Sequence, residues 1–525
     1  MRILFCLFFL TISTSYAQQW LGISSSNYSG TYGIYNNPAN IADSRYKFFM
    51  NFAGANADVI NNYASWAAPF SIVGLMTRTV PNRYLAPSGL PIFSLSYIKE
   101  KTNISNVTSF ASIDIKGPSL MYNFSKYKFS IGLTSRVRVL TNLNNTTPDV
   151  AHILVKTTFD PNIFGVRQDN SHFSMNTNGF AEMGLTIGAV IKEQEQDFFK
   201  IGLTAKRLNG LFNVHLLADN LDYVIDANAL RPLRQDLFFY KAQGIYGTTS
   251  GDALRNFSFT PNWLFGNLAA GTGYGIDIGG VYEYRPDFYK YDIKLKGKWS
   301  MDGTKNKYLY RLGFALLDVG SIHYNNPAYV KQVGINKPNV YVAPETFSKI
   351  DSPDKFYHQM NDAFNIAPAS YTSDFTVVLP MALSTNFDYK YSEKIYINAS
   401  WIQSLRNPKV LGMNQPSLIA LTPRFETKWI DVAAPIALQN GYRNLTIGLM
   451  GRFGPLFIGT ENLGGVLNIA KPNGINFYMG LFLPLFMKLP DSPNGCYVET
   501  TSGLKHELRE LFKKNKQKRK WNKVR

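Results

Sequence analysis

Segments in which apolar residues alternate with polar residues or glycine recur along most of this 525-residue chain. The clearest lies at 127–139, where every second residue except Ser135 is apolar and the residues between include Lys128, Arg136 and Arg138. Successive side chains of a strand point to opposite faces, so each segment predicts a strand with one apolar and one polar face. Many aromatic-rich strands of this kind predict an all-β fold, a transmembrane antiparallel β-barrel of the outer membrane.

The two ends of the chain have a different composition. Residues 1–17 resemble a cleavable signal peptide, with Arg2 before an apolar run that is too short to span a bilayer. The next residues are rich in Gly, Asn, Ser and Tyr and predict an irregular lead-in rather than a strand. The expected organisation is a signal peptide at 1–17, a hatch-like lead-in at 18–44, the barrel at 45–486 and a basic periplasmic tail at 487–525.

Fourteen segments qualify as strands, and the lengths of the connections between them support that count. Short and long connections alternate, as they do in bacterial barrels with short periplasmic turns and long outer loops. One connection, 286–306, is long for an inner turn. A sixteen-strand barrel stays open, because 211–227 and 236–247 could form an extra hairpin. The candidates lie near 45–57, 107–123, 127–140, 178–192, 197–209, 272–285, 307–319, 374–390, 394–405, 416–427, 429–438, 444–452, 455–462 and 474–486.

The alternation also predicts which side chains face lipid. In the strand near 178–192, Leu185 and Ile187 are expected on the lipid side and Glu182 on the lumen side. In the segment at 379–389, Leu379 and Phe387 fall on the predicted lipid face and Asp388 on the lumen face.

Charged residues at lumen-facing positions are the main candidates for a functional role. They predict either a mutually paired wall that fills the interior or a basic strip that favours anionic solutes, since rings of charge set selectivity. The candidate selectivity residues are Lys128, Arg136, Arg138, Glu182, Lys200, Lys206, Asp277, Glu283, Arg311 and Asp388.

The formal net charge is +18, and much of it lies at one end. Lys505–Arg525 carries ten Lys or Arg residues against two Glu. Nucleic acid is not an expected partner, because the chain is predicted to be exported. The tail is expected to be either a solvated appendage or a dock for acidic periplasmic or envelope proteins, while the barrel contacts outer-membrane lipid. The candidate docking residues are Lys513, Lys514, Lys516, Lys518, Arg519 and Lys520.

Enzyme signatures are scarce, and no enzymatic activity, metal site or cofactor is predicted. Ser321 and His323 share one face of a strand end, with Asp318 nearby in sequence. Nucleophilic catalysis needs a base in hydrogen-bond reach and a third group that orients it, which spacing alone does not provide. The segment His506–Glu510 lacks the second histidine of a zinc-binding helix.

Several motifs resemble known barrels. Five segments resemble a family of outer-membrane barrels that is typical of Bacteroidota and known only as a domain of unknown function. They are Asn37–Ala39, Ile41–Tyr46, Gly273–Asp287, Tyr310–Tyr324 and Gly454–Leu463. That resemblance implies an outer-membrane barrel and no catalytic residues. The Asn-Pro-Ala lead-in also resembles, more loosely, the fourteen-stranded long-chain fatty-acid transporters with an N-terminal hatch. A third loose similarity is to barrels associated with gliding and type IX secretion.

Three functions follow as expectations. The first is a passive channel or transporter for small solutes. The second is a non-transport envelope scaffold, or a secretion- or gliding-associated barrel that binds periplasmic partners. A distant third is an integral-membrane hydrolase.

Overall fold

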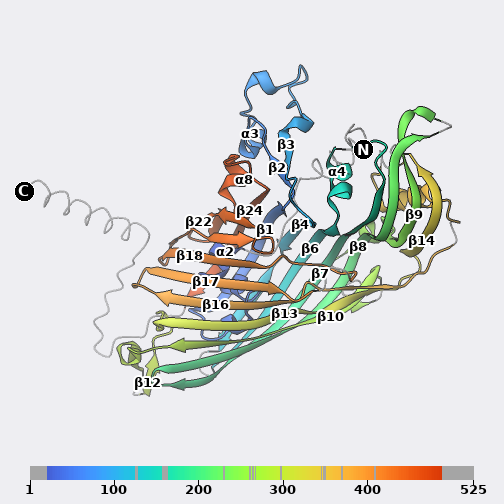
Figure 1. Ribbon diagram of the computed structural model, residues 1–525. Helices are drawn as coiled ribbons and strands as arrows, with labels where there is room; N and C mark the ends of the chain where they lie inside the picture. Colours follow the sequence, from blue (N-terminus) through green and yellow to red (C-terminus); the bar gives the residue numbers. More distant parts are fainter. Residues whose placement is uncertain are drawn as a thin grey trace, which may run out of the picture.

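The chain forms a closed antiparallel β-barrel (Figure 1). The computed structural model describes residues 20–486, except for short gaps at 125–127, 157–162, 229–230, 259, 261, 263–264, 267, 296–297, 344–345, 347–349, 368–369 and 407–409. The wall consists of β1 (Tyr46–Asn61), β4 (Val107–Lys116) with β5 (Ser119–Phe124), β6 (Phe129–Thr146), β7 (Gln168–Gln194), β8 (Asp197–Asn228), β10 (Gly271–Tyr284), β13 (Tyr310–Tyr324), β15 (Phe375–Val378) with β16 (Ala382–Lys390), β17 (Ile395–Ser404), β18 (Leu418–Glu426), β19 (Ile430–Ala433) with β20 (Ile436–Gln439), β21 (Asn444–Ile447) with β22 (Leu449–Phe453), β23 (Leu456–Thr460) and β24 (Gly474–Phe486).

The first and last strands close the wall. β1 pairs with β24 from Tyr46↔Phe486 to Ile60↔Gly474, and with β4 and β5 on its other edge. Counting each interrupted pair as one strand, the described residues form a fourteen-strand barrel, as the sequence predicted. Closure removes free strand edges, which a bilayer cannot satisfy with hydrogen bonds.

The predicted extra hairpin exists but lies outside the barrel wall. β8 is long, and its first half pairs with β10 up to Gly210↔Gly271. Its second half pairs with β9 (Arg231–Thr249), which in turn pairs with β14 (Val330–Val342). Because β10 lies directly against β8, the hairpin extends beyond the wall instead of adding two strands, so the sixteen-strand alternative does not form in the described residues.

The two ends of the barrel differ. Figure 1 shows α3, α4 and β9 at one end and β12 at the other. Short turns join β7 to β8 and β16 to β17, and this short-turn end is periplasmic in bacterial barrels. The long connection at 285–309, here called the inner segment, contains η6 (Phe288–Tyr291) and a hairpin of β11 (Asp292–Leu295) and β12 (Lys298–Met301).

The long loops carry most of the helices. They contain β2 (Ala64–Trp66), α3 (Ile72–Met76), η3 (Asn82–Tyr84), η4 (Leu95–Tyr97), β3 (Ile98–Glu100), α4 (Pro148–Lys156), α5 (Asp252–Arg255), α7 (Pro353–Ala363) and α8 (Leu463–Leu467). Among the described residues, no helix has both the length and the apolar character needed to cross a bilayer.

The predicted facing holds along most of the wall. Leu185 and Ile187 are 46% and 42% exposed on the outside, whereas Glu182 is buried inside. The assignment of Leu379 to the lipid face was wrong, because this residue is fully buried in an apolar cluster inside the barrel. The wall strand is interrupted between β15 and β16, and the interruption shifts the alternation by one residue, so a strict period of two fails there.

Candidate functional site

The lumen is filled by the residues that precede the first strand. Residues 20–44, here called the plug, contain α2 (Leu21–Ser24), η1 (Gly30–Gly33) and η2 (Pro38–Ile41). The plug contacts strands far apart around the wall: the Leu21 amide donates to Glu461, and the Asn27 amide side chain donates to Glu426. The lead-in expected to be irregular therefore lies inside the barrel in its described part.

A groove of glycines in the wall receives the tightest turn of the plug. The turn forms because Asn37 caps η2, accepting from the Ala39 amide at 2.9 Å, with Pro38 as the first helical residue. The Asn37 side chain also donates to the carbonyls of Gly280 and Phe314 on β10 and β13.

Glycine is required in that groove because atoms of the plug occupy the space that a side chain on the wall residue would need. A Cβ on Gly202 would lie 2.3 Å from the Pro38 carbonyl carbon and 2.4 Å from the Ala39 nitrogen. A Cβ on Gly188 would lie 2.3 Å from a methyl carbon of Ile41. Alternation with glycine on the lumen face therefore marks where the wall accommodates the plug.

Aromatic side chains anchor the other end of the plug. Trp20 lies 5.8 Å from Phe457 and 5.6 Å from Tyr478, measured between ring centroids. The ammonium of Lys116 lies 3.9 Å from the centroid of Trp20, a cation–π contact that would be worth about 2 kcal/mol when desolvated. Lys116 also pairs with Asp114 at 2.5 Å.

Arg136 and Arg138 of β6 and Lys206 of β8 belong to a paired charge layer. Arg136 lies 2.9 Å from Glu182, and Lys206 lies 2.7 Å from Asp277. All four side chains are at most 3% exposed. The wall thus brings these predicted residues together as ion pairs, which leaves little unbalanced charge at this level.

Asp318 is the member of this layer that the alternation did not predict. It pairs with Arg138 at 2.8 Å and with Lys206 at 2.5 Å. β13 carries a bulge here, because Asp277 of β10 faces two residues, Leu317 and Asp318. A bulge turns the next side chain to the other face. A sequence pattern that assumes a strict period gives no signal for it.

An apolar layer separates the charge layer from the long-loop end. It is formed by inward residues of many strands and by Met413 from a loop. Its main members are Ile60, Phe110, Leu140, Phe180, Leu208, Ile322, Tyr324, Phe375, Val377 and Leu379. Plug, charge layer and apolar layer therefore follow one another along the lumen.

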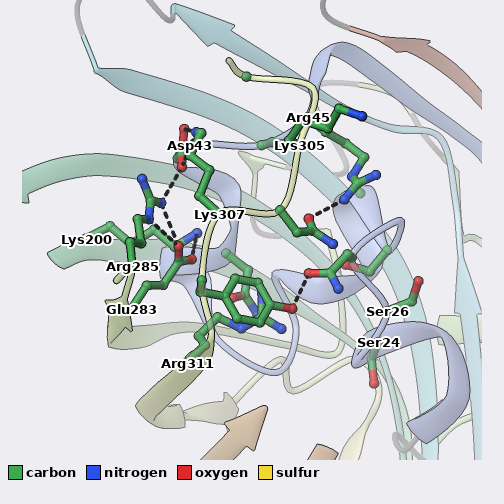
Figure 2. A pocket seen from close by; sticks show the side chains of 18 residues that line it. Ser24, Ser26, Asp43, Arg45, Lys200, Glu283, Arg285, Lys305, Lys307 and Arg311 are labelled. Carbon is green, nitrogen blue, oxygen red and sulfur yellow. Dashed lines mark hydrogen bonds and ion pairs between the residues drawn. The ribbon is translucent and has the colours of Figure 1, made fainter. Parts of the chain in front are cut away.

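A second group of predicted charges lies at the short-turn end (Figure 2). Lys200 donates to the Ala42 carbonyl of the plug at 2.9 Å and lies 3.5 Å from Glu283. Arg311 pairs with Asp388 at 3.2 Å, and the same carboxylate pairs with the unpredicted Arg424 at 2.9 Å.

Asp43, at the end of the plug, is held among these cations. It lies 2.7 Å from Arg285 and 3.4 Å from Lys307. Burial alone would raise the pKa of Asp43, but Lys307, Arg285 and Lys200 together outweigh burial and hold that pKa well below its usual range. The plug therefore ends in a carboxylate fixed by cations of the inner segment.

The remaining predicted residues do not join these layers. Lys128 was expected on the lumen face, but it lies in a turn before β6 with its side chain 54% exposed and paired with Glu193. Ser321, His323 and Asp318 do not assemble, because His323 contacts Thr376 and Asp374 while Asp318 pairs with Arg138.

Two further predictions concern metals and the tail. No group of three or more metal-ligating side chains occurs in the part of the chain that the structure describes. The predicted tail residues Lys513, Lys514, Lys516, Lys518, Arg519 and Lys520, like the signal peptide, lie outside the described residues.

A closed fourteen-strand wall with an apolar exterior and a polar, plugged interior defines an outer-membrane β-barrel. A family model matches residues 38–461, and the chain belongs to that family, described as a family of unknown function (DUF5723).

No curated protein gives a significant match. Solved structures similar to this chain include a FadL homologue of Pseudomonas aeruginosa, with 12% identity, TM-score 0.38 and coverage of 90% of this chain and 98% of that one. The toluene transporter TbuX of Ralstonia pickettii has 9% identity, TM-score 0.35 and coverage of 87% and 94%. The toluene transporter TodX of Pseudomonas putida has 8% identity, TM-score 0.30 and coverage of 89% and 96%.

Proposed function

We propose that this outer-membrane barrel is a gated transporter for small solutes and that the plug is its gate. The observation that carries the proposal is a wide barrel whose interior is occupied by a separate segment. Eight strands enclose a space that wall side chains can fill, whereas wider barrels hold channels or plugs. A fourteen-strand wall needs a filler, and residues 20–44 supply it.

The contacts that hold the plug support a reversible gate. Several are hydrogen bonds and ion pairs, such as Lys200 to the Ala42 carbonyl and Asn27 to Glu426. Water can replace such contacts when the plug moves, so each contributes only about 1 kcal/mol net, or roughly 2–3 where a charge takes part. The plug occupies the lumen, so the proposed passage of solutes requires that the plug move out of the way.

Deleting Gln19–Asn40 tests the gate. Single-channel conductance in planar bilayers should rise well above that of the full chain, because the deletion removes the filler and leaves the wall intact. Truncation after Gly503 removes the same number of residues from the other end of the chain and is the matched control, with no expected rise. A folded, heat-modifiable deletion variant that stays closed would argue against transport.

A non-transport scaffold is the second candidate, and the filled lumen favours it. Under this alternative the apolar layer, which wall and loop side chains form, keeps the route to the long-loop end closed even without the plug. Under this alternative the plug deletion remains non-conducting, and partner proteins co-purify equally well with the full chain and with the deletion variant.

A further inference from the structure

A small polar pocket lies at the short-turn end, where plug, wall and inner segment meet (Figure 2). Its cavity of about 60 Å³ can hold a few waters or one small polar group. The plug contributes Asp43, the wall contributes Lys200 and Glu283, and the inner segment contributes Arg285, Lys305 and Lys307. The pocket therefore depends on all three parts being in place.

The lining of this pocket is strongly basic. It contains six Lys or Arg side chains and two carboxylates, a formal excess of four positive charges. The basic residues are Arg45, Lys200, Arg285, Lys305, Lys307 and Arg311. Like charges this close repel one another, and partial burial strengthens the repulsion because screening by water falls.

Carboxylates in and beside the pocket pair with four of the six cations: Glu283 lies 3.5 Å from Lys200, and Asp388 lies 3.2 Å from Arg311. Asp43 is shared between Arg285 at 2.7 Å and Lys307 at 3.4 Å. Arg45 hydrogen-bonds the neutral Asn306 and stacks on a tyrosine ring instead of pairing with a carboxylate. Lys305 is exposed and has no ion pair among the described residues. Arg45 and Lys305, from separate elements, are thus the two pocket cations that no carboxylate pairs with among the described residues.

We propose that this pocket binds a small phosphate-type oxyanion at the periplasmic mouth of the barrel. Tetrahedral oxyanions accept several charge-assisted hydrogen bonds at once, and Arg and Lys are the side chains that supply them. The lining faces the lumen, since it is formed by the plug and by inward positions such as Lys200 and Arg311. The ligand is therefore a soluble phosphate or phosphate monoester, not a lipid headgroup.

Binding has a consequence for the plug. An anion that contacts Lys305 or Lys307 on one side and Arg45 on the other joins the inner segment to the start of β1, where the plug ends. It also offsets the repulsion among the cations that surround Asp43. The bound anion therefore stabilises the closed arrangement, and this inference stands whether or not the barrel conducts.

Calorimetric titration of the full chain in detergent micelles tests the site. Sodium phosphate should bind saturably when compared with sodium chloride at equal ionic strength. Lys305→Ala should weaken binding by about three- to tenfold, and Lys305→Ala with Lys307→Ala by more, through loss of charge-assisted hydrogen bonds. Asp43→Asn should instead tighten binding, because it removes a negative charge from the lining.

Lys394→Ala is the matched control, since Lys394 is an exposed lysine in a turn at the same end of the barrel and outside the pocket. Its phosphate affinity should equal that of the unaltered chain. Absence of saturable binding, or equal affinities for the Lys305 and Lys394 variants, would overturn the proposal. Heat-modifiability of each variant shows that it is folded, so a lost signal cannot be ascribed to misfolding.

A lipid source is tested separately in nanodiscs without phosphate. If phosphatidylglycerol discs raise the melting temperature relative to phosphatidylcholine discs, and Lys305→Ala abolishes the rise, the ligand is a lipid headgroup and the soluble source is wrong. Equal melting temperatures in both discs, with stabilisation on addition of phosphate, support the soluble anion.

Discussion

At the residue scale, glycines on the lumen face place the plug against the wall. Gly202→Ala should destabilise the barrel by roughly 1–3 kcal/mol, because the added Cβ would overlap the backbone at Pro38 and Ala39. Gly451→Ala is the control, since a Cβ there meets nothing within 4 Å. Urea titration followed by unheated gel migration measures both, and equal midpoints would mean that the plug does not occupy this groove.

A second residue-scale prediction concerns the bulge at Asp318. Asp318→Asn should lower the free energy of unfolding by about 3–5 kcal/mol, because it leaves Arg138 and Lys206 buried with less compensating negative charge. Asparagine tolerates the positive φ of 54° at this position, so backbone strain is not the cause.

The matched control for Asp318 is a solvent-exposed pair. Asp287→Asn removes a contact with Lys290 in which both side chains are at least half exposed, and should cost no more than about 1 kcal/mol. If both substitutions lower the free energy of unfolding equally in the same urea titration, the charge layer is hydrated rather than buried.

At the element scale, β7 tests the assignment of the lipid face. Leu185→Arg should destabilise the barrel by roughly 2–4 kcal/mol near the bilayer midplane, and Ile191→Arg by about 0–1 near the interface. Both residues are exposed on the outer face, and Ile191 lies close to the end of the strand. The free energy of folding of both variants is measured by refolding into lipid vesicles. If Ile191→Arg is more destabilising than Leu185→Arg, the assigned depths of the two residues are wrong.

The lumen face of β7 is not expected to tolerate an introduced charge either, so it cannot serve as the control for Leu185→Arg. Thr186 would be permissive if the interior were a water-filled channel. It is fully buried and hydrogen-bonds Thr204 at 2.8 Å, so Thr186→Arg is expected to be costly as well. Burial of Thr186 thus makes both faces of this strand sensitive to charge, for different physical reasons.

The alternation predicted the elements well because lipid on one side and a polar interior on the other impose a period of two. It failed where that period breaks: at Leu379, next to an interruption, and at Asp318, on a bulge. It also could not pair charges across strands, because pairs such as Arg424 with Asp388 depend on register. The Asn-Pro-Ala turn and the lumen glycines were visible in the sequence, but their contact required the fold.

At the scale of the whole molecule, closure between β1 and β24 makes the barrel a cooperative unit. Unheated protein in sodium dodecyl sulfate should migrate differently from boiled protein and should fractionate with outer membranes, because a closed barrel has no free edge from which to unravel. Circular dichroism should be dominated by strand. A helical spectrum, or recovery in a soluble periplasmic fraction, would contradict the fold.

The basic tail gives a last prediction at this scale, and it follows from where the wall ends. The final pairing is Tyr46↔Phe486, so the strands close before residue 487. Truncation after Gly503 should therefore leave a heat-modifiable barrel in the outer membrane. We propose that Lys505–Arg525, with ten basic residues, docks acidic periplasmic partners. Such contacts should weaken with salt, because exposed charges are screened beyond about 8 Å at physiological ionic strength.

Co-purification from native membranes followed by mass spectrometry distinguishes the outcomes. A partner lost both on truncation and at high salt supports docking through the tail. If the same proteins co-purify with and without the tail, docking is wrong. If truncation blocks insertion, the tail acts in barrel assembly instead, because the wall itself is complete without it.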